Sequence, residues 1–274
     1  MQAWRASLPM YNLPEMRAEN AAFWAALYVE LGAELGPEGM THLPEELTFD
    51  RPPVPGAIEA ENLFTQVCGY PLQTIFRGQA RLLGVPTYMV EHCAPGRHAA
   101  VFIVRADAPY RALADLRGAK FVFNSPHSNS GMNLPRLALA RFGARAPFFG
   151  SITETHSHPA NVERVAKGEA DATCVDNVTY AFMLRHRPWV AERTRILAPT
   201  PSTPAIPFVT AITTPEPIVA ALQAALGRVA RDPRWAVARA GLMLADILPP
   251  EGTDYPEQLR FVEEAAALGY PEFR

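Results

Sequence analysis

Residues 121–136 read Phe121-Val122-Phe123-Asn124-Ser125-Pro126-His127-Ser128-Asn129-Ser130-Gly131-Met132-Asn133-Leu134-Pro135-Arg136. An apolar run stops at a group of small polar residues, and apolar residues at helical spacing follow it. This pattern predicts a strand, a turn and a helix. Backbone N–H groups in the first turn of a helix lack partners inside the helix and carry the positive end of its dipole. We therefore expect an anion-binding site at this turn.

The same residues could instead serve only as a helix cap. Ser and Asn are preferred N-cap residues, so Ser128 or Ser130 could fill that role alone. A cap needs one such side chain, whereas the turn carries Ser125, Ser128, Asn129 and Ser130 within six positions. This excess of hydroxyl and amide groups favours an anion site over a plain cap.

The composition is typical of a globular chain. It has 274 residues, of which 49% are hydrophobic and 19% charged, and a net charge of −3 without a basic block. This length allows two domains or one large domain, and the charge argues against nucleic-acid binding. No apolar run approaches membrane-spanning length, so we expect no membrane insertion. The three cysteines lack metal-ligand spacing, so we expect buried free thiols. We expect neither a metal nor a cofactor.

The first residues bear on the compartment. They lead directly into a strand expected over residues 3–10 and do not resemble a signal peptide. As written, the chain is expected in the cytoplasm, while a trimmed or mis-started secretory precursor stays open as an alternative.

Expected strands and helices alternate along almost the whole chain. Helices are expected over residues 15–35, near 55–63, and over 217–231, 233–244 and 256–268. This alternation predicts an α/β fold whose sheets are mixed, mostly parallel and flanked by helices.

Two linkers, near residues 92–97 and 199–206, isolate the middle of the chain. They predict two lobes joined by hinge crossovers. One lobe would be discontinuous, with residues 1–95 and 204–274. The other, residues 96–203, would contain Ser125 through Gly131, which we call the anion loop. A ligand cleft between the lobes is the expected consequence.

Several segments, taken in chain order, resemble a known family. They are Ser7-Leu8-Pro9-Met10-Tyr11, Gln66-Val67-Cys68-Gly69-Tyr70-Pro71, Asp115-Leu116-Arg117-Gly118-Ala119-Lys120-Phe121, Ser125 through Gly131, and the run from His158 through Gly168 and Ala170-Asp171-Ala172 to Asp176. The chain resembles the phosphate/phosphonate periplasmic-binding-protein family of ABC transporters, which has the type II periplasmic-binding fold. It differs where the family commonly has Ser-Thr-Ser, because Asn129 stands between Ser128 and Ser130.

The resemblance implies a monomeric solute-binding protein that closes on a small phosphonate- or phosphate-like oxyanion and works with an ABC permease, without catalytic residues. The ligand-binding residues that it implies are Tyr11, Tyr70, Ser125, Ser128, Asn129, Ser130, His158 and Asp176. An N-cap is a strong alternative for Asp176, and a core position is the alternative for each tyrosine. His127 and His156 are more simply interpreted as solvent-facing loop residues.

A function of another class stays as an alternative. An enzyme or sensor on the same fold could act on a small organic acid or cofactor precursor in the cytoplasm. The sequence contains no Gly-x-Ser-x-Gly elbow, Walker loop or His-Glu-x-x-His motif. Turnover would distinguish the two classes, because a binding protein returns its ligand unchanged.

Overall fold

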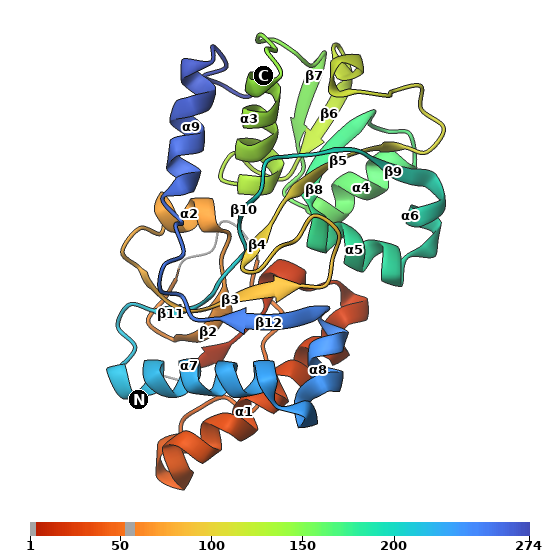
Figure 1. The fold of residues 1–274 in the computed structure, drawn as a ribbon. Helices are drawn as coiled ribbons and strands as arrows, with labels where there is room; N and C mark the ends of the chain where they lie inside the picture. The colour runs from red at the N-terminus through yellow and green to blue at the C-terminus, as the bar shows by residue number, and fades with distance from the viewer. Residues whose placement is uncertain (1–3, 53–57) are drawn as a thin grey trace. The chain divides into compact units, whose positions relative to one another are not determined.

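A computed structural model of the chain describes residues 4–52 and 58–274. The chain divides into two compact units, each with its own five-stranded sheet (Figure 1). Unit 1 is formed by Met1–Met89, Ala94–Arg97 and Pro204–Asp254, and unit 2 by Val90–Cys93, His98–Thr203 and Tyr255–Arg274.

Unit 1 has the strand order β1-β2-β11-β3-β12. Its strands are β1 (Arg5–Ala6), β2 (Asn62–Gln66), β11 (Phe208–Ala211), β3 (Ala80–Tyr88) and β12 (Leu244–Leu248). Strand β1 is parallel to β2, while β11 is antiparallel to β2 and β3, and β12 is antiparallel to β3. Its helices are η1 (Pro9–Tyr11), η2 (Pro14–Met16), α1 (Arg17–Met40), α2 (Gly69–Gln73), α7 (Glu216–Arg231), η5 (Pro233–Trp235) and α8 (Ala236–Gly241).

Aromatic packing joins helix α1 to the sheet of unit 1. Phe208 on β11 stacks on Phe64 of β2 and on Phe23 of α1, with ring centroids 5.2 and 5.7 Å apart. Phe23 and Leu27 are fully buried on the same face of the helix, as the sequence spacing predicts. The expected helix over residues 15–35 is therefore confirmed, with a break at Gly36, whose φ is 66°.

Unit 2 has the strand order β7-β6-β8-β5-β9. Its strands are β7 (Ser151–Glu154), β6 (Lys120–Phe123), β8 (Ala172–Asp176), β5 (Ala100–Arg105) and β9 (Thr194–Pro199). Strand β6 is parallel to β7 and β8, while β5 is antiparallel to β8 and β9. Its helices are η3 (Leu113–Leu116), η4 (Asn129–Asn133), α3 (Leu134–Arg141), α4 (His158–Ala166), α5 (Asn177–His186), α6 (Pro188–Arg193) and α9 (Glu257–Ala267).

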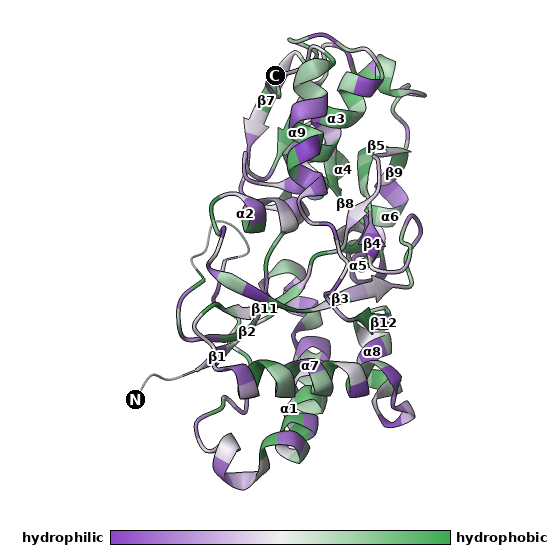
Figure 2. Cartoon of the chain, turned by 60° about the vertical axis from the view of Figure 1, so that its left-hand side comes forward, coloured by the Kyte–Doolittle hydropathy of each residue, from purple (hydrophilic) through white to green (hydrophobic). Residues whose placement is uncertain are grey.

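Strand β5 lies inside the sheet of unit 2 and is buried along almost its whole length. Its sequence is accordingly a nearly unbroken apolar run, which Figure 2 colours as hydrophobic. Phe121 of β6 stacks on Phe149 with ring centroids 4.3 Å apart. Helices α3 and α9 lie side by side in unit 2 (Figure 1), and Phe261 of α9 is part of the same core. The two parallel strands β6 and β8 are neighbours, so their carboxyl ends meet at one edge.

The strand, turn and helix expected from residues 121–136 are confirmed as β6, η4 and α3. The mixed α/β class is confirmed too, although antiparallel pairs are prominent in both sheets. Of the strand expected over residues 3–10, residue 3 lies outside the described residues, and the described part forms only β1 at Arg5–Ala6, followed by the turn of η1. Of the helix expected near residues 55–63, residues 53–57 lie outside the described residues, and β2 begins at Asn62.

The end of the chain differs most from expectation. Where a helix was expected over residues 233–244, the chain forms the short helices η5 and α8, and Leu244 is already the first residue of β12. Residues 255–274 belong to unit 2, whereas the sequence suggested the other lobe. The two-residue strands β4 (Arg97–His98) and β10 (Thr203–Pro204) pair with each other, and within each of them the chain passes from one unit to the other.

Candidate functional site

The candidate site lies at the carboxyl ends of β6 and β8 in unit 2. Phe121 and Val122 of β6 pair in register with Ala172 and Thr173 of β8. The loop after β6 and the residue that ends β8, Asp176, therefore lie at one edge of the sheet. Ligands of open α/β sheets bind at such an edge.

The first turn after β6 is organised by serines. Ser128 is the N-cap of η4, and its Oγ accepts a hydrogen bond of 2.9 Å from the Gly131 N–H. The Oγ of Ser125 accepts one of 3.1 Å from the His127 N–H. The capping interpretation of Ser128 is thus confirmed. The N–H groups of Asn129 and Ser130, in the first turn of a π-helical segment, still have no acceptor inside the helix.

Ser130 and His158 form the central contact of the site. The Ser130 Oγ lies 3.0 Å from the His158 Nε2, and which atom donates depends on the imidazole tautomer. Burial lowers the pKa of His158 below its usual value near 6.5, and the charge of Asp176 opposes this shift. The imidazole is therefore neutral at neutral pH. Its Nδ1 is buried and has no hydrogen-bond partner among the described residues.

Gly131 allows the helix backbone to approach both Asn124 and His158. A Cβ atom at this position would lie 2.0 Å from the Asn124 Oδ1 and 3.2 Å from the His158 Cε1. Both distances are closer than ordinary packing of a methyl group. The Oδ1 of Asn124 is itself buried and has no partner among the residues that the structure describes. Asn124 is thus a site residue that the sequence analysis missed, although its place directly after a strand was a usable signal.

Asp176 is 1% exposed and caps helix α5. Its Oδ1 accepts from the Thr179 N–H at 2.8 Å and its Oδ2 from the Thr179 Oγ1 at 2.6 Å, which confirms the capping interpretation. In a Ser-His-acid triad the acid would orient the histidine through a hydrogen bond. Here the Nδ1 of His158 has no such bond among the described residues, so the contacts are not those of a triad.

Asn129 is directed into the protein. The sequence predicted that its amide would serve the ligand, but this side chain is 1% exposed. Its Nδ2 donates to the Thr203 Oγ1 at 3.3 Å, and its Oδ1 accepts from the Asn133 Nδ2 at 3.0 Å. The group that Asn129 can offer a ligand most directly is therefore its backbone N–H.

The two predicted tyrosines belong to unit 1. Tyr11 is buried in η1, and its ring meets Tyr88 edge-on with centroids 5.6 Å apart, as in a core position. Tyr70 is half-buried in α2. In unit 2, His127 is half-buried, and the exposed His156 lies with its Nδ1 3.2 Å from the Glu154 Oε1. The other predicted residues all belong to unit 2: Ser125, Ser128, Asn129, Ser130, His158 and Asp176.

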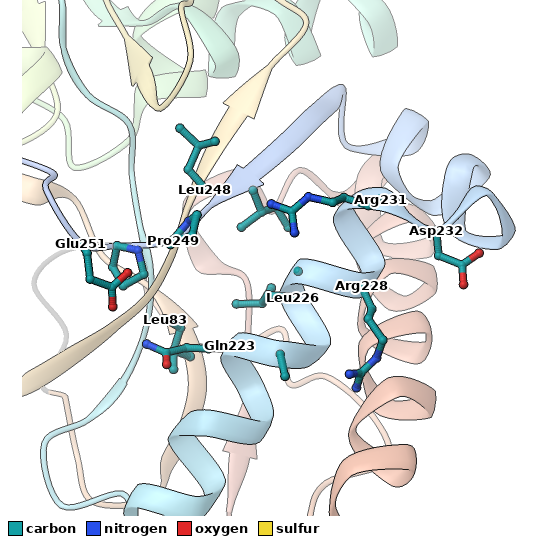
Figure 3. Close-up of a pocket in the computed structure, with 13 residues that line it drawn as sticks. Leu83, Gln223, Leu226, Arg228, Arg231, Asp232, Leu248, Pro249 and Glu251 are labelled. Atoms are coloured by element: carbon teal, nitrogen blue, oxygen red, sulfur yellow. The ribbon is translucent and has the colours of Figure 1, made fainter.

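A separate hollow of about 580 Å³ lies in unit 1 and contains none of the predicted residues. Figure 3 shows Gln223 and Leu226 on α7 opposite Leu248 and Pro249. Its lining is mainly apolar but also includes the charged side chains of Arg228, Arg231, Asp232 and Glu251.

The described residues form neither a membrane-spanning helix nor a cluster of metal ligands. No helix within 4–52 or 58–274 is long and apolar enough to cross a membrane. Within the same ranges, no group of three or more His, Cys, Asp or Glu side chains is placed to hold a metal ion.

The profile of one protein family matches residues 78–255, more than half of the chain. Its description is ABC transporter, phosphonate, periplasmic substrate-binding protein. No curated protein matches the sequence.

Solved structures of similar fold cover nearly the whole chain. A binding protein component of an ABC phosphonate transporter from Pseudomonas aeruginosa has a TM-score of 0.73 at 15% identity, covering 98% of this chain and 94% of that one. PhnD1 from Prochlorococcus marinus, in complex with methylphosphonate, has a TM-score of 0.69 at 15% identity, covering 97% and 98%. XAC2383 from Xanthomonas citri, bound to ATP, has a TM-score of 0.65 at 16% identity, covering 97% and 98%. At these identities the likeness shows the fold alone, which is the type II periplasmic-binding fold expected from the sequence.

Proposed function

The chain belongs to the family of phosphonate-binding periplasmic substrate-binding proteins of ABC transporters, and on this premise we propose that it binds a small phosphonate- or phosphate-like oxyanion at the group of residues in unit 2. Members of such a family bind a small ligand and work with a permease. We also propose that the protein is a monomer, and sedimentation velocity measures its oligomeric state. PhnD1 in complex with methylphosphonate supports the ligand class.

The contact between Ser130 and His158 carries the proposal. A hydroxyl and a neutral imidazole meet at the first turn of a helix, where backbone N–H groups are free to donate. Hydrogen bonds from such neutral groups to an ionised oxygen are charge-assisted and shorter than ordinary ones. The guanidinium of Arg136 is turned elsewhere, toward the Pro271 carbonyl at 2.9 Å. The group thus offers fixed dipoles for a tetrahedral anion.

Removing the two hydroxyls should abolish tight binding. Ser130→Ala with Ser128→Ala is expected to weaken methylphosphonate binding by about tenfold to a hundredfold for each hydrogen bond lost, because a bond to a charged group contributes about 1.5–3 kcal/mol. Isothermal titration with phosphate, phosphite, alkylphosphonates and sulfonates measures this change.

The matched control is Ser151→Ala with Thr153→Ala, which removes two hydroxyls from the exposed strand β7 of the same unit. It should bind as the wild type does. A wild-type chain that binds none of these oxyanions, or a serine variant that binds unchanged, would refute the proposed ligand class.

Asp176 is expected to select the protonation state of the ligand. Its carboxylate can accept a hydrogen bond from a protonated phosphoryl oxygen and repels an anion that carries no proton. Asp176→Asn keeps an efficient N-cap for α5, so the free energy of unfolding should change little. The ratio of methylsulfonate to methylphosphonate affinity should rise, and competition titrations measure it. If the affinity ratio is unchanged, Asp176 serves only as the N-cap of α5 and does not select the ligand.

A further inference from the structure

A buried polar network supports the anion loop from the C-terminal segment of unit 2. Thr203 and Gln258 are both 0% exposed, and the Gln258 Nε2 donates to the Thr203 Oγ1 at 3.0 Å. The same Thr203 oxygen accepts from the Asn129 Nδ2 at 3.3 Å. The Asn133 Nδ2 donates to the backbone oxygen of Gln258 at 3.0 Å. Helix α9 is thus linked to the loop directly through its backbone and, by way of Thr203, through the Gln258 side chain.

The side chain of Gln258 is poorly explained as a source of stability. Its Oε1 is buried and has no hydrogen-bond partner among the described residues. A buried acceptor without a partner is destabilising and offsets the hydrogen bond that the Nε2 of the same side chain donates to Thr203. The amide oxygen and nitrogen of a glutamine can be exchanged in assignment, but either orientation leaves one end of this amide without a hydrogen-bond partner among the described residues.

The network ends at the residues that carry the anion donors. Asn129 begins η4 and directly precedes Ser130, whose hydroxyl meets His158. Holding the Asn129 amide at both ends fixes the first turn of η4 and the direction of its free N–H groups. Such support lowers the ordering cost that a ligand would otherwise meet on binding.

We propose that Gln258, acting through Thr203 and Asn129, is a positioning residue that preorganises the anion loop. The inference rests on the proposed function where ligand affinity is concerned. Its structural part, a loop held in place by α9, stands without any ligand.

Gln258→Met keeps the length of the side chain and leaves the backbone bond from Asn133 in place. We expect an unfolding midpoint equal to or above that of the wild type. Methylphosphonate affinity should fall by about threefold to tenfold, as for the loss of a neutral hydrogen bond near 1 kcal/mol. Thr203→Val should have the same effect on affinity, and the double variant should lose less than the sum, because both residues act in one network. Thr203→Ser, which keeps the hydroxyl, should restore binding.

Thr200→Val is the matched control. The Thr200 Oγ1 is also buried but accepts from the Ala100 N–H, away from the loop. Its loss should lower the unfolding midpoint and leave affinity unchanged. If Gln258→Met instead lowers the midpoint and leaves affinity unchanged, the residue is merely structural and the inference fails.

A measurement on the ligand-free protein separates this inference from the proposed function. The N–H groups of Gly131 and Asn133 are bonded to Ser128 within the loop, at 2.9 and 3.1 Å. Their hydrogen exchange should accelerate at least threefold in Gln258→Met and stay unchanged in Thr200→Val. Unchanged exchange in Gln258→Met overturns the inference whatever the ligand is, whereas a wild type that binds no oxyanion while exchange accelerates refutes only the proposed ligand.

Discussion

Gly131→Ala is expected to destabilise unit 2 by about 1–3 kcal/mol, the usual cost of an added methyl group in a closely packed place. The new Cβ would require Asn124 to rotate and His158 to move by some tenths of an ångström. Because His158 meets Ser130 at 3.0 Å, this shift should also weaken methylphosphonate binding by tenfold or more, about 1.4 kcal/mol. Denaturant unfolding and isothermal titration measure the two effects.

A double-mutant cycle tests the cause. In an Asn124→Ala background the closest clash is removed, so Gly131→Ala should cost clearly less than in the wild type. Gly32→Ala is the control, because a Cβ there meets nothing within 4 Å and lies in helix α1. It should stabilise the protein by about 0.4–1 kcal/mol. Equal costs of Gly131→Ala in both backgrounds would contradict the packing argument.

The stability of the protein should fall in mild acid through His158. Its pKa is lowered in the folded chain, mainly by burial, from an ordinary value of 6.5. Below that value the unfolded chain binds a proton at this histidine that the folded chain does not bind, so the free energy of unfolding decreases as pH falls. The slope is at most about 1.4 kcal/mol per pH unit, and it ends at the lowered pKa of the folded state.

His158→Gln should remove this slope, so the difference in unfolding free energy between wild type and variant should narrow from pH 7 to pH 5. Urea denaturation at a series of pH values measures it. His156→Asn, which replaces an exposed histidine at positive φ with another residue that tolerates it, serves as the control and should keep the wild-type slope. Parallel curves for wild type and His158→Gln would show that His158 does not titrate differently on folding.

Local features of the fold could be predicted because single segments determine them. Residues 121–136 contain an apolar run, capping residues and helical spacing, and each became the element that this pattern favours. Strand β12 was missed because Leu244–Leu248 follows short helices and has only two of its residues, Leu244 and Ile247, fully buried. The apolar and polar residues of this segment alternate only weakly, so their pattern does not distinguish a strand from the neighbouring helices.

The sequence pointed to the loop after β6 and to the end of β8, but it indicated neither Asn124 nor the contacts inside this group of residues. Ser130 and Asp176 lie at one edge because β6 and β8 are parallel neighbours, and His158 lies there because β7 is parallel to β6. The amide of Asn129 reads as a ligand donor in sequence, yet its partner is Thr203, far along the chain. No sequence pattern links these two positions, so only the folded structure could reveal that the Asn129 side chain bonds a buried partner.

The placement of residues 255–274 in unit 2 has a consequence for synthesis on the ribosome. Most of unit 2, residues 98–203, is synthesised before residues 204–254 of unit 1. Helix α9, which packs on α3, is made only after those residues. Unit 1 likewise waits for Pro204–Asp254 to complete its sheet. Neither unit can therefore finish folding early in translation, and the incomplete core around Phe121 is left for a time without its last helix. We expect this interval to be when the nascent chain depends most on chaperones.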